Sequence, residues 1–323
     1  MHTQTDMTIN QRTLTTFKNL DEALSLDNQK NYLFPLPHLS ILDVVGDNAT
    51  TFLQGQLTCD VHAVTDITMI RGAQCNLQGR INYLMDIFHW QGIKMLLPTD
   101  LVEDTIKSLN KAAQLSRVNI HLNQQLQVLG LYIQSNEQTL GPDIFYPSTT
   151  YGLSFNKDYC CYHLGDGFYI VICLAQFAQQ LIAAFQEKEQ ILGSLIWHTL
   201  RLLKKDFSIY PESRGLFLPH RVDLHLTSMV NFNKGCYKGQ EIIARMHYKA
   251  TIKHQLTLFE VTTEEPISSG QKIFALTGAE AGEVVDYSLL GKNHYLVAAS
   301  LLKDCSNQVL FAGHLNPVTL KWI

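Results

Sequence analysis

The sequence lacks several signals that would assign it at once to a class of protein. Its 323 residues include no uninterrupted apolar run of about 18 residues, and residues 1–30 have no apolar core behind a basic start, which argues against a membrane span and a secretory leader. Charged residues make up only 17% of the chain and the formal net charge is -4, so bulk nucleic-acid binding is not indicated. These absences predict a globular cytoplasmic protein with no membrane contact and no direct stable nucleic-acid binding.

Cysteine is present, but not in a pattern that builds a site. The seven cysteines are an odd number and none of them forms a C-x-x-C pair, which argues against a disulfide framework and against a thiolate metal site. The adjacent Cys160 and Cys161 could form a redox or cluster site. Neighbouring side chains of an extended segment point to opposite faces, so we favour packing near a strand end. The chain also lacks a G-x-G-x-x-G segment and a P-loop, which disfavours the usual dinucleotide and phosphate sites.

The length predicts more than one domain, because 323 residues exceed one ordinary compact core. Residues 1–30 are polar and mixed, and we expect a loosely held N-terminal arm. Residues 31–250 intermingle strand and helix patterns, as in an α+β body, and two interleaved subdomains, of which about 55–120 is one, are compatible with this pattern. The final residues, 251–323, contain only β-type patterns and are expected to form a separate C-terminal domain.

In the body, residues 39–45 read as a strand, and Gly46 with Asp47 supplies a turn and an N-cap for a short helix that Gly55 can terminate. Residues 71–75 and 81–90 flank a glycine-containing connection typical of a hairpin. Asp100 and Glu103 have capping-box spacing at the start of a later helix. A further helix over about 194–204 contains Trp197 at or beside its apolar side.

The C-terminal region contains six short runs of β type separated by Gly, Pro, Asn, Asp and Ser. They cover residues 255–261, 272–276, 282–287, 295–301, 308–311 and 318–322. Such spacing predicts a small barrel or sandwich.

The most unusual stretch is residues 231–247, centred on Cys236. This cysteine lies between Gly235 and Gly239 with Lys234 and Lys238 on either side, and Gln240 and Glu241 open an apolar helical run. Glycine permits a positive φ or a close backbone approach, and nearby cations or a helix N-terminus lower the pKa of a thiol and make it a better nucleophile. The alternative is a glycine-rich turn with Cys236 as small buried filler.

The segment Lys-Gly-Cys-Tyr-Lys-Gly-Gln-Glu over 234–241 resembles the K-G-C-Y-x-G-Q-E signature of the YgfZ family of folate-binding proteins, relatives of the glycine-cleavage T protein, an aminomethyltransferase. Residues 52–61 are similar to the family's Q-G-Q-x-T-x-D-V segment, and residues 217–219 to the stretch before the signature. The resemblance reaches from about 39 to 250. It implies a multidomain T-protein-like folate-binding body with a C-terminal small β-barrel.

The resemblance also implies a function in iron–sulfur cluster assembly and tRNA processing, with tetrahydrofolate or a derivative as cofactor and iron–sulfur enzymes or cluster-assembly proteins as partners. Cys236 becomes the expected reactive residue, whether catalytic or a transient ligand. The residues expected at the cofactor are Trp197, Lys234, Gly235, Tyr237, Lys238, Gly239, Gln240, Glu241 and Arg245.

Individual roles follow from chemistry and from the resemblance. Arg245 suits the carboxylates of a folate tail, because a guanidinium binds carboxylate in a bidentate way. Glu241 is expected to cap its helix or to orient Lys234. Trp197 corresponds to a tryptophan that contacts folate in the family, whereas Leu39 replaces a second tryptophan found in some relatives.

Two other functions stay open. A folate-dependent aminomethyltransferase needs a carboxylate near the folate, and Asp60 and Asp86 are the acids available. A folate-free binding module is the second alternative. The sequence does not decide whether the chain is an enzyme or a non-catalytic assembly factor.

Overall fold

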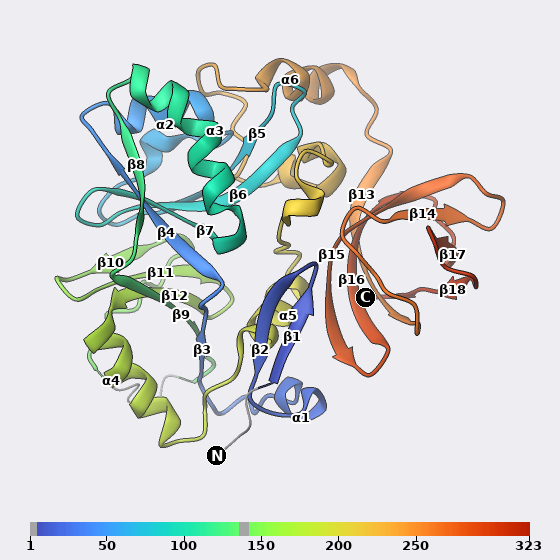
Figure 1. Cartoon of the computed structure of the whole chain (residues 1–323), viewed down its shortest axis with the longest axis horizontal. Coiled ribbons are helices and arrows are strands. Elements are labelled where there is room, and N and C mark those ends of the chain that lie inside the picture. Colours follow the sequence, from blue (N-terminus) through green and yellow to red (C-terminus); the bar gives the residue numbers. More distant parts are fainter. Residues whose placement is uncertain (1–4, 136–141) are drawn as a thin grey trace.

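The computed structural model describes residues 5–135 and 142–323. Two five-stranded sheets and a C-terminal barrel dominate the molecule (Figure 1). The first sheet has the order β5-β6-β7-β4-β8. Its strands are β4 (Leu39–Val45), β5 (Ile70–Cys75), β6 (Ile81–His89), β7 (Ile93–Pro98) and β8 (Asn119–Asn123). The second has the order β10-β11-β12-β9-β3. Its strands are β3 (Tyr32–Pro35), β9 (Leu126–Tyr132), β10 (Leu153–Phe155), β11 (Tyr159–Gly165) and β12 (Phe168–Leu174).

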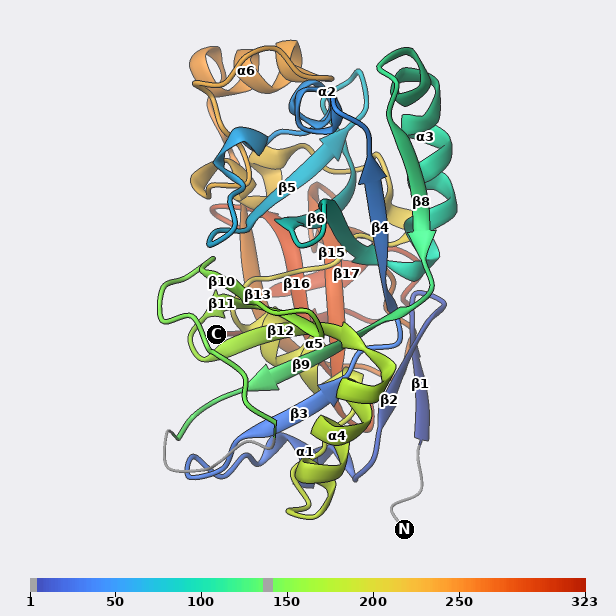
Figure 2. The same cartoon turned by 90° about the vertical axis from the view of Figure 1, so that its left-hand side faces the viewer.

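Helices cover the outer faces of the two sheets, and the inner faces share a core. The helices α2 (Ala49–Gln56) and α3 (Val102–Leu115) pack on the first sheet and α4 (Ala175–Gln186) packs on the second (Figure 2). Phe88 from β6 and Phe168 from β12 belong to one buried cluster together with Trp197. Trp197 lies on α5 (Ser194–Leu203), the helix between the body and the barrel.

The barrel has seven antiparallel strands and is nearly closed. Its order is β18-β17-β14-β15-β16-β13-β19. The strands are β13 (His254–Thr262), β14 (Lys272–Ala275), β15 (Glu280–Gly291), β16 (His294–Leu302), β17 (Gln308–Phe311), β18 (Val318–Thr319) and β19 (Lys321–Trp322). Because β18 pairs with β17 and β19 pairs with β13, one short terminal segment joins both edges of the sheet. All six predicted runs coincide with these strands apart from Leu276 and Leu320, and the predicted α+β body with a small terminal barrel is confirmed.

The N-terminal segment differs from the expected loose arm. Residues 1–4 lie outside the described part, but β1 (Thr5–Ile9) and β2 (Arg12–Thr16) form a hairpin, followed by α1 (Leu20–Leu24). Ile9 and Leu14 are fully buried in the cluster that also fills the barrel. A polar composition hid this role, because one buried apolar side chain from each strand is enough to dock the hairpin.

Two local predictions are also corrected. Helix α2 begins after Asn48, and Gly55 lies inside it instead of ending it. Asp100 lies in a 3₁₀ turn, η2 (Thr99–Leu101), and its carboxylate binds the Arg12 guanidinium at 2.9 Å through both oxygens. A distant cation therefore takes the carboxylate that the capping-box spacing assigned to the helix.

Candidate functional site

The two sequence motifs, far apart along the chain, form one structural unit. The backbone N–H of Asn231 donates to the Thr58 carbonyl at 2.9 Å, and the N–H of Lys238 donates to the Gly55 carbonyl at 3.1 Å. The Thr58 hydroxyl donates to the Met229 carbonyl at 2.6 Å. The loop around Cys236 is thus fastened to the end of helix α2.

Lys234 makes the strongest of these contacts between the loop and α2. Its ammonium donates to the carbonyl oxygens of Gln54, Leu57 and Cys59, each at 2.7 Å. These carbonyls lie at and just beyond the C-terminal end of α2, where the helix dipole favours a positive charge. Burial lowers the pKa of Lys234 to about 8, while the nearby Cys59 and Asp60 oppose that shift. The three donors of this ammonium are therefore used within the protein.

Gly239 sets the geometry that starts helix α6 (Gln240–Lys249). Its φ is +83°, and an added Cβ would lie 2.4 Å from the Asn76 carbonyl oxygen. Gly79 faces it from the turn between β5 and β6, with a φ of +71°. Two glycine backbones thus pass close to each other, which explains one of the two glycines in the signature.

The remaining signature residues divide between the core and the surface. Tyr237 is buried, burial raises the pKa of its phenol, and its ring lies 5.0 Å from the Lys234 ammonium. The Gln240 side chain accepts from the Tyr237 N–H at 3.3 Å. Cys236 is exposed, and a Cβ added at Gly235 would meet nothing within 4 Å. The interpretation of Cys236 as buried filler is therefore wrong.

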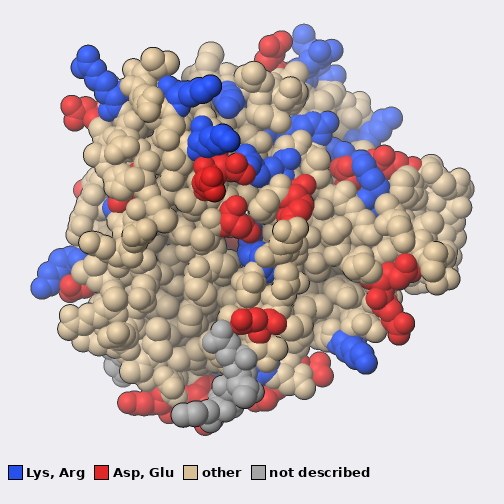
Figure 3. All heavy atoms as spheres, in the orientation of Figure 1, with Lys and Arg blue, Asp and Glu red and all other residues tan. Residues whose placement is uncertain are grey.

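Helix α6 carries the other exposed signature residues. Glu241 and Arg245 are both exposed on it, and Lys234 is oriented by carbonyl oxygens and not by Glu241. Figure 3 shows Lys and Arg mainly in the upper half of this face, the half that carries α6, with Asp and Glu among them.

A cavity of about 110 Å³ lies inside the body, between the two sheets and helix α5. Trp197 and Leu39 both line it, so the structure brings together the two positions that the family comparison linked. A second cavity of about 420 Å³ adjoins the first and shares Arg71, Arg201 and Asp206 with it. The second volume, but not the first, falls within the range of about 300–1,000 Å³ that is typical of small-molecule sites.

Trp197 is both a core residue and a cavity residue. It is only 6% exposed, and a Cβ added at Gly130 would approach its ring to 2.6 Å. The ring centroid of Phe34 lies 5.4 Å from that of Trp197 in a tilted arrangement, and the ring centroid of Phe168 lies at 5.6 Å in an edge-to-face arrangement. Glycine at position 130 lets the indole lie flat against β9, which fixes where its remaining surface meets the cavity.

A series of ion pairs runs along the wall of the first cavity. Arg71 donates to Asp86 at 2.8 Å and to Asp206 at 2.8 Å, and Arg201 donates to Asp206 at 2.7 Å. Burial by itself raises the pKa of Asp206, but the two guanidiniums outweigh it and hold that pKa well below its usual range. The Tyr162 hydroxyl donates to the other oxygen of Asp86 at 2.9 Å.

Several of the residues that the sequence predicted for the site lie outside the lining of both cavities. Lys234, Lys238 and Arg245 do not line either cavity, and neither does Cys236. The residues that sequence reasoning missed are Arg71, Arg201, Asp206 and His198, which line the first cavity. Their only sequence signal is a charged side chain within or beside a buried element. Arg71 in β5 and Arg201 in the last turn of α5 are examples.

Asp60 and Asp86 occupy different environments. Asp60 accepts from the Gln54 side chain at 2.8 Å and precedes the 3₁₀ turn η1 (Val61–Ala63), as its N-cap. Asp86 lines the first cavity. Of the two acids considered for an aminomethyltransferase, one is thus a local structural cap and the other faces the cavity.

Comparisons with known proteins show what the chain as a whole resembles. The chain is 26% identical over 305 residues to the "tRNA-modifying protein YgfZ" of Colwellia psychrerythraea, covering 90% of the chain and 91% of that relative. It is 27% identical over 248 residues to the protein of the same name from Photobacterium profundum, covering 74% and 73%. The chain is YgfZ-like. No protein-family model matches it.

The fold of this YgfZ-like chain is also found among solved structures. The glycine cleavage system aminomethyltransferase T from Bartonella henselae superposes with a TM-score of 0.76 over 99% of this chain and 93% of that one, at 13% identity. This match shows the fold of the T protein. In the part of the YgfZ-like chain that the structure describes, no helix is long and apolar enough to cross a membrane.

Proposed function

We propose that the chain binds tetrahydrofolate or a derivative in the paired cavities and, in that form, supports iron–sulfur enzymes and thereby tRNA modification. The observation that carries the proposal is the joint lining of one cavity by Trp197 and Leu39 within a T-protein-like fold. The name of the similar proteins, tRNA-modifying protein YgfZ, supports the tRNA part.

The chemistry of the lining suits a folate. A folate combines a flat polar heterocycle with an anionic tail. The first cavity offers an aromatic ring at Trp197, apolar walls such as Leu39 and Leu96, and the polar chain through Arg71 and Asp206. Bound tetrahydrofolate would supply a carrier for a one-carbon unit, and the residues named here would hold and orient it.

The second cavity provides the better location for the tail. Lys204 and Lys205 line it, both exposed, with Arg71 and Arg201 deeper in the wall. Lys204 pairs with Asp166 at 2.9 Å, which leaves Lys205 as the more available cation of the two. This location differs from the one that the sequence suggested for the tail, which was Arg245.

Cys236 is the proposed reactive group of the loop. It lies on the surface near the start of α6, away from the lining of both cavities. An exposed thiol on a loop fastened at Lys234 and Lys238 can meet a partner protein without rearrangement of the core. We therefore assign Cys236 to contact with iron–sulfur partners and not to chemistry on the folate.

Aminomethyl transfer is the second candidate function, and the fold similarity to an aminomethyltransferase favours it. It needs a carboxylate at the cofactor that can manage a proton. Asp86 faces the cavity, but its two oxygens already accept from Arg71 and Tyr162. Both oxygens of Asp86 are thus engaged within the protein, which favours the accessory function.

Three measurements on the purified chain separate these functions. Tetrahydrofolate is titrated while tryptophan fluorescence is followed, glycine-cleavage activity is assayed, and rescue of an iron–sulfur enzyme defect is scored in cells. We expect binding and rescue without one-carbon turnover. Turnover would favour the aminomethyltransferase, and the absence of binding would leave the folate-free module.

Variants of the cavity sharpen the binding measurement. Trp197→Ala is expected to weaken binding by about 0.5–1.5 kcal/mol for the aromatic contact, plus lost apolar burial. Leu39→Trp should tighten binding if the ring enters the cavity. Lys205→Gln should reduce the preference for polyglutamated folate and the salt dependence of binding, whereas the control Lys238→Gln should change neither. Equal effects of the two lysine variants would contradict the proposed location of the tail.

A further inference from the structure

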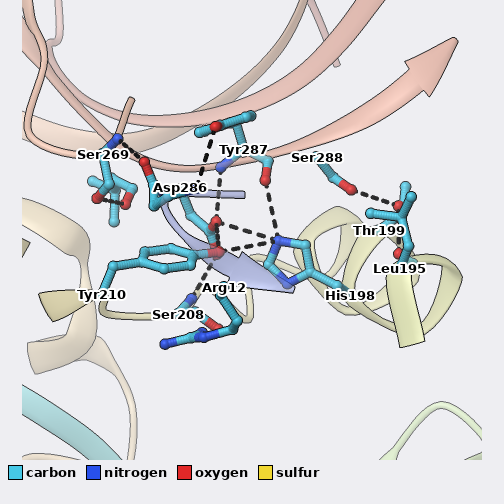
Figure 4. A network of polar contacts seen from close by, with 12 residues as sticks. Arg12, Leu195, His198, Thr199, Ser208, Tyr210, Ser269, Asp286, Tyr287 and Ser288 are labelled. Carbon is cyan, nitrogen blue, oxygen red and sulfur yellow. Dashed lines mark hydrogen bonds and ion pairs between the residues drawn. The ribbon is translucent and has the colours of Figure 1, made fainter. Parts of the chain in front are cut away.

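A buried polar network joins helix α5 to the barrel beside the first cavity (Figure 4). Asp286 of β15 is fully buried at its centre. Its carboxylate accepts from the Tyr210 hydroxyl, the Ser208 N–H and the Tyr287 N–H, each at 2.7 Å. A buried carboxylate with this many donors is held in one orientation.

His198 of α5 faces the same carboxylate. Its Nε2 lies 3.3 Å from the Asp286 carboxylate, 3.1 Å from the Tyr287 carbonyl oxygen and 3.5 Å from the Tyr210 hydroxyl. A carbonyl and a carboxylate only accept hydrogen bonds, so Nε2 must carry a hydrogen. The barrel therefore fixes the tautomer and the ring orientation of His198.

The other side of the ring has a different environment. His198 is one of the residues lining the first cavity, next in sequence to Trp197. In Figure 4 its second ring nitrogen, Nδ1, points away from Asp286. With Asp286 as a buried counter-ion, the charged imidazolium is the form that balances the network, and Nδ1 then carries a hydrogen that can be donated to a ligand.

We propose that His198 donates from Nδ1 to a carbonyl oxygen of the bound folate heterocycle, and that Asp286 acts from the barrel as the positioning residue that keeps His198 charged and oriented. The inference rests on the proposed function and deepens it. It makes the barrel part of ligand recognition, although the barrel supplies no residue to the lining of the first cavity.

The charged and titratable groups around His198 come from four elements or connections. Asp286 lies on β15, Tyr210 follows α5, Arg12 lies on β2, and His38 precedes β4. Burial lowers the pKa of His198, but the Asp286 carboxylate outweighs burial and the Arg12 charge and raises it above its ordinary value. Burial, with Arg12 and His198, lowers the pKa of His38, so His38 stays neutral beside it.

The test is the affinity for tetrahydrofolate between pH 6 and 9, measured by fluorescence under anaerobic reducing conditions. The wild-type affinity should fall as the pH rises through the pKa of His198, by up to about ten-fold per pH unit. His198→Gln should lose affinity about ten-fold or more at pH 6.5 and show no such pH dependence. Asp286→Asn should move the break to lower pH and regain affinity on acidification.

Thr199→Val is the matched control. Thr199 binds Ser288 at 2.7 Å in the same contact of α5 with β15 but is absent from the cavity lining. Its variant should keep the wild-type pH profile even if thermal stability falls. If Asp286→Asn does not fold, the nuclear magnetic resonance titration of His198 in the unliganded wild type still decides, because it must show hydrogen on Nε2 and a raised pKa.

The outcomes are distinguishable. A wild type that binds no tetrahydrofolate at any pH removes the proposed function and this inference with it. A wild type that binds with a flat pH profile, or a His198→Gln variant that binds like wild type, removes this inference alone.

Discussion

Lys234 shows at the scale of one residue how a signature position can be structural. Its ammonium satisfies three carbonyl oxygens at the end of α2. Lys234→Met should leave these acceptors unpaired and lower the free energy of unfolding by about 1.5–3 kcal/mol. Denaturant unfolding followed by circular dichroism measures this change. An unchanged midpoint would mean that water replaces the ammonium without penalty.

Cys236 should behave in the opposite way. Because it is exposed and a Cβ at the neighbouring Gly235 meets nothing, Cys236→Ser should unfold at the wild-type midpoint, within about 0.5 kcal/mol. We expect the variant to bind tetrahydrofolate normally and to fail in rescuing a deletion strain. Cys305→Ser is the control, since Cys305 is partly exposed on the barrel. Full rescue by Cys236→Ser would make the signature a structural turn only.

At the scale of an element, the start of helix α6 depends on one of the two signature glycines. Gly239→Ala combines a positive φ with a Cβ only 2.4 Å from the Asn76 oxygen, and should cost about 1–3 kcal/mol. Gly235→Ala is its matched control and should be close to neutral, because the added Cβ meets nothing. Thermal unfolding of both variants makes the comparison. Equal losses would show that loop flexibility, and not backbone strain at Gly239, decides the effect.

Elements with a strong local pattern could be predicted from the sequence. Strand β4 occupies the predicted residues 39–45, and Cys160 and Cys161 pack into different clusters on β11, as expected for neighbours in a strand. The sequence could not predict which side chains pair when they lie far apart along the chain. The partners of Arg12, the charge chain through Arg71, and the pairing of His198 with Asp286 depend on tertiary contacts that leave no local periodicity.

At the scale of the whole molecule, the loss of stability at acid pH should depend on buried histidines. His220 is fully buried, neither of its ring nitrogens has a hydrogen-bond partner within the described part of the chain, and His225 lies 4.6 Å away. Burial, with His225 and His247, lowers the pKa of His220 to about 4. The unfolded chain takes up this proton near pH 6.5 and the folded chain only near 4, so stability must fall as the pH drops through that window.

The size of this effect can be isolated by substitution. His220 alone contributes a slope of up to about 1.4 kcal/mol per pH unit between pH 6.5 and 4. His220→Phe should remove that part of the slope while keeping a ring beside His225. Unfolding free energies of both proteins at several pH values provide the measurement, and parallel curves would show that His220 does not bind its proton differently in the two states.

The docked N-terminal hairpin has a consequence for the growing chain on the ribosome. Asn10 contacts Ser269 and Tyr287, which follow it by 259 and 277 residues. At about 5–20 residues per second, the hairpin waits roughly 13–55 s for these partners. During that interval Ile9 and Leu14 have no barrel to cover them, so the hairpin leaves the exit tunnel well before the strands on which it docks.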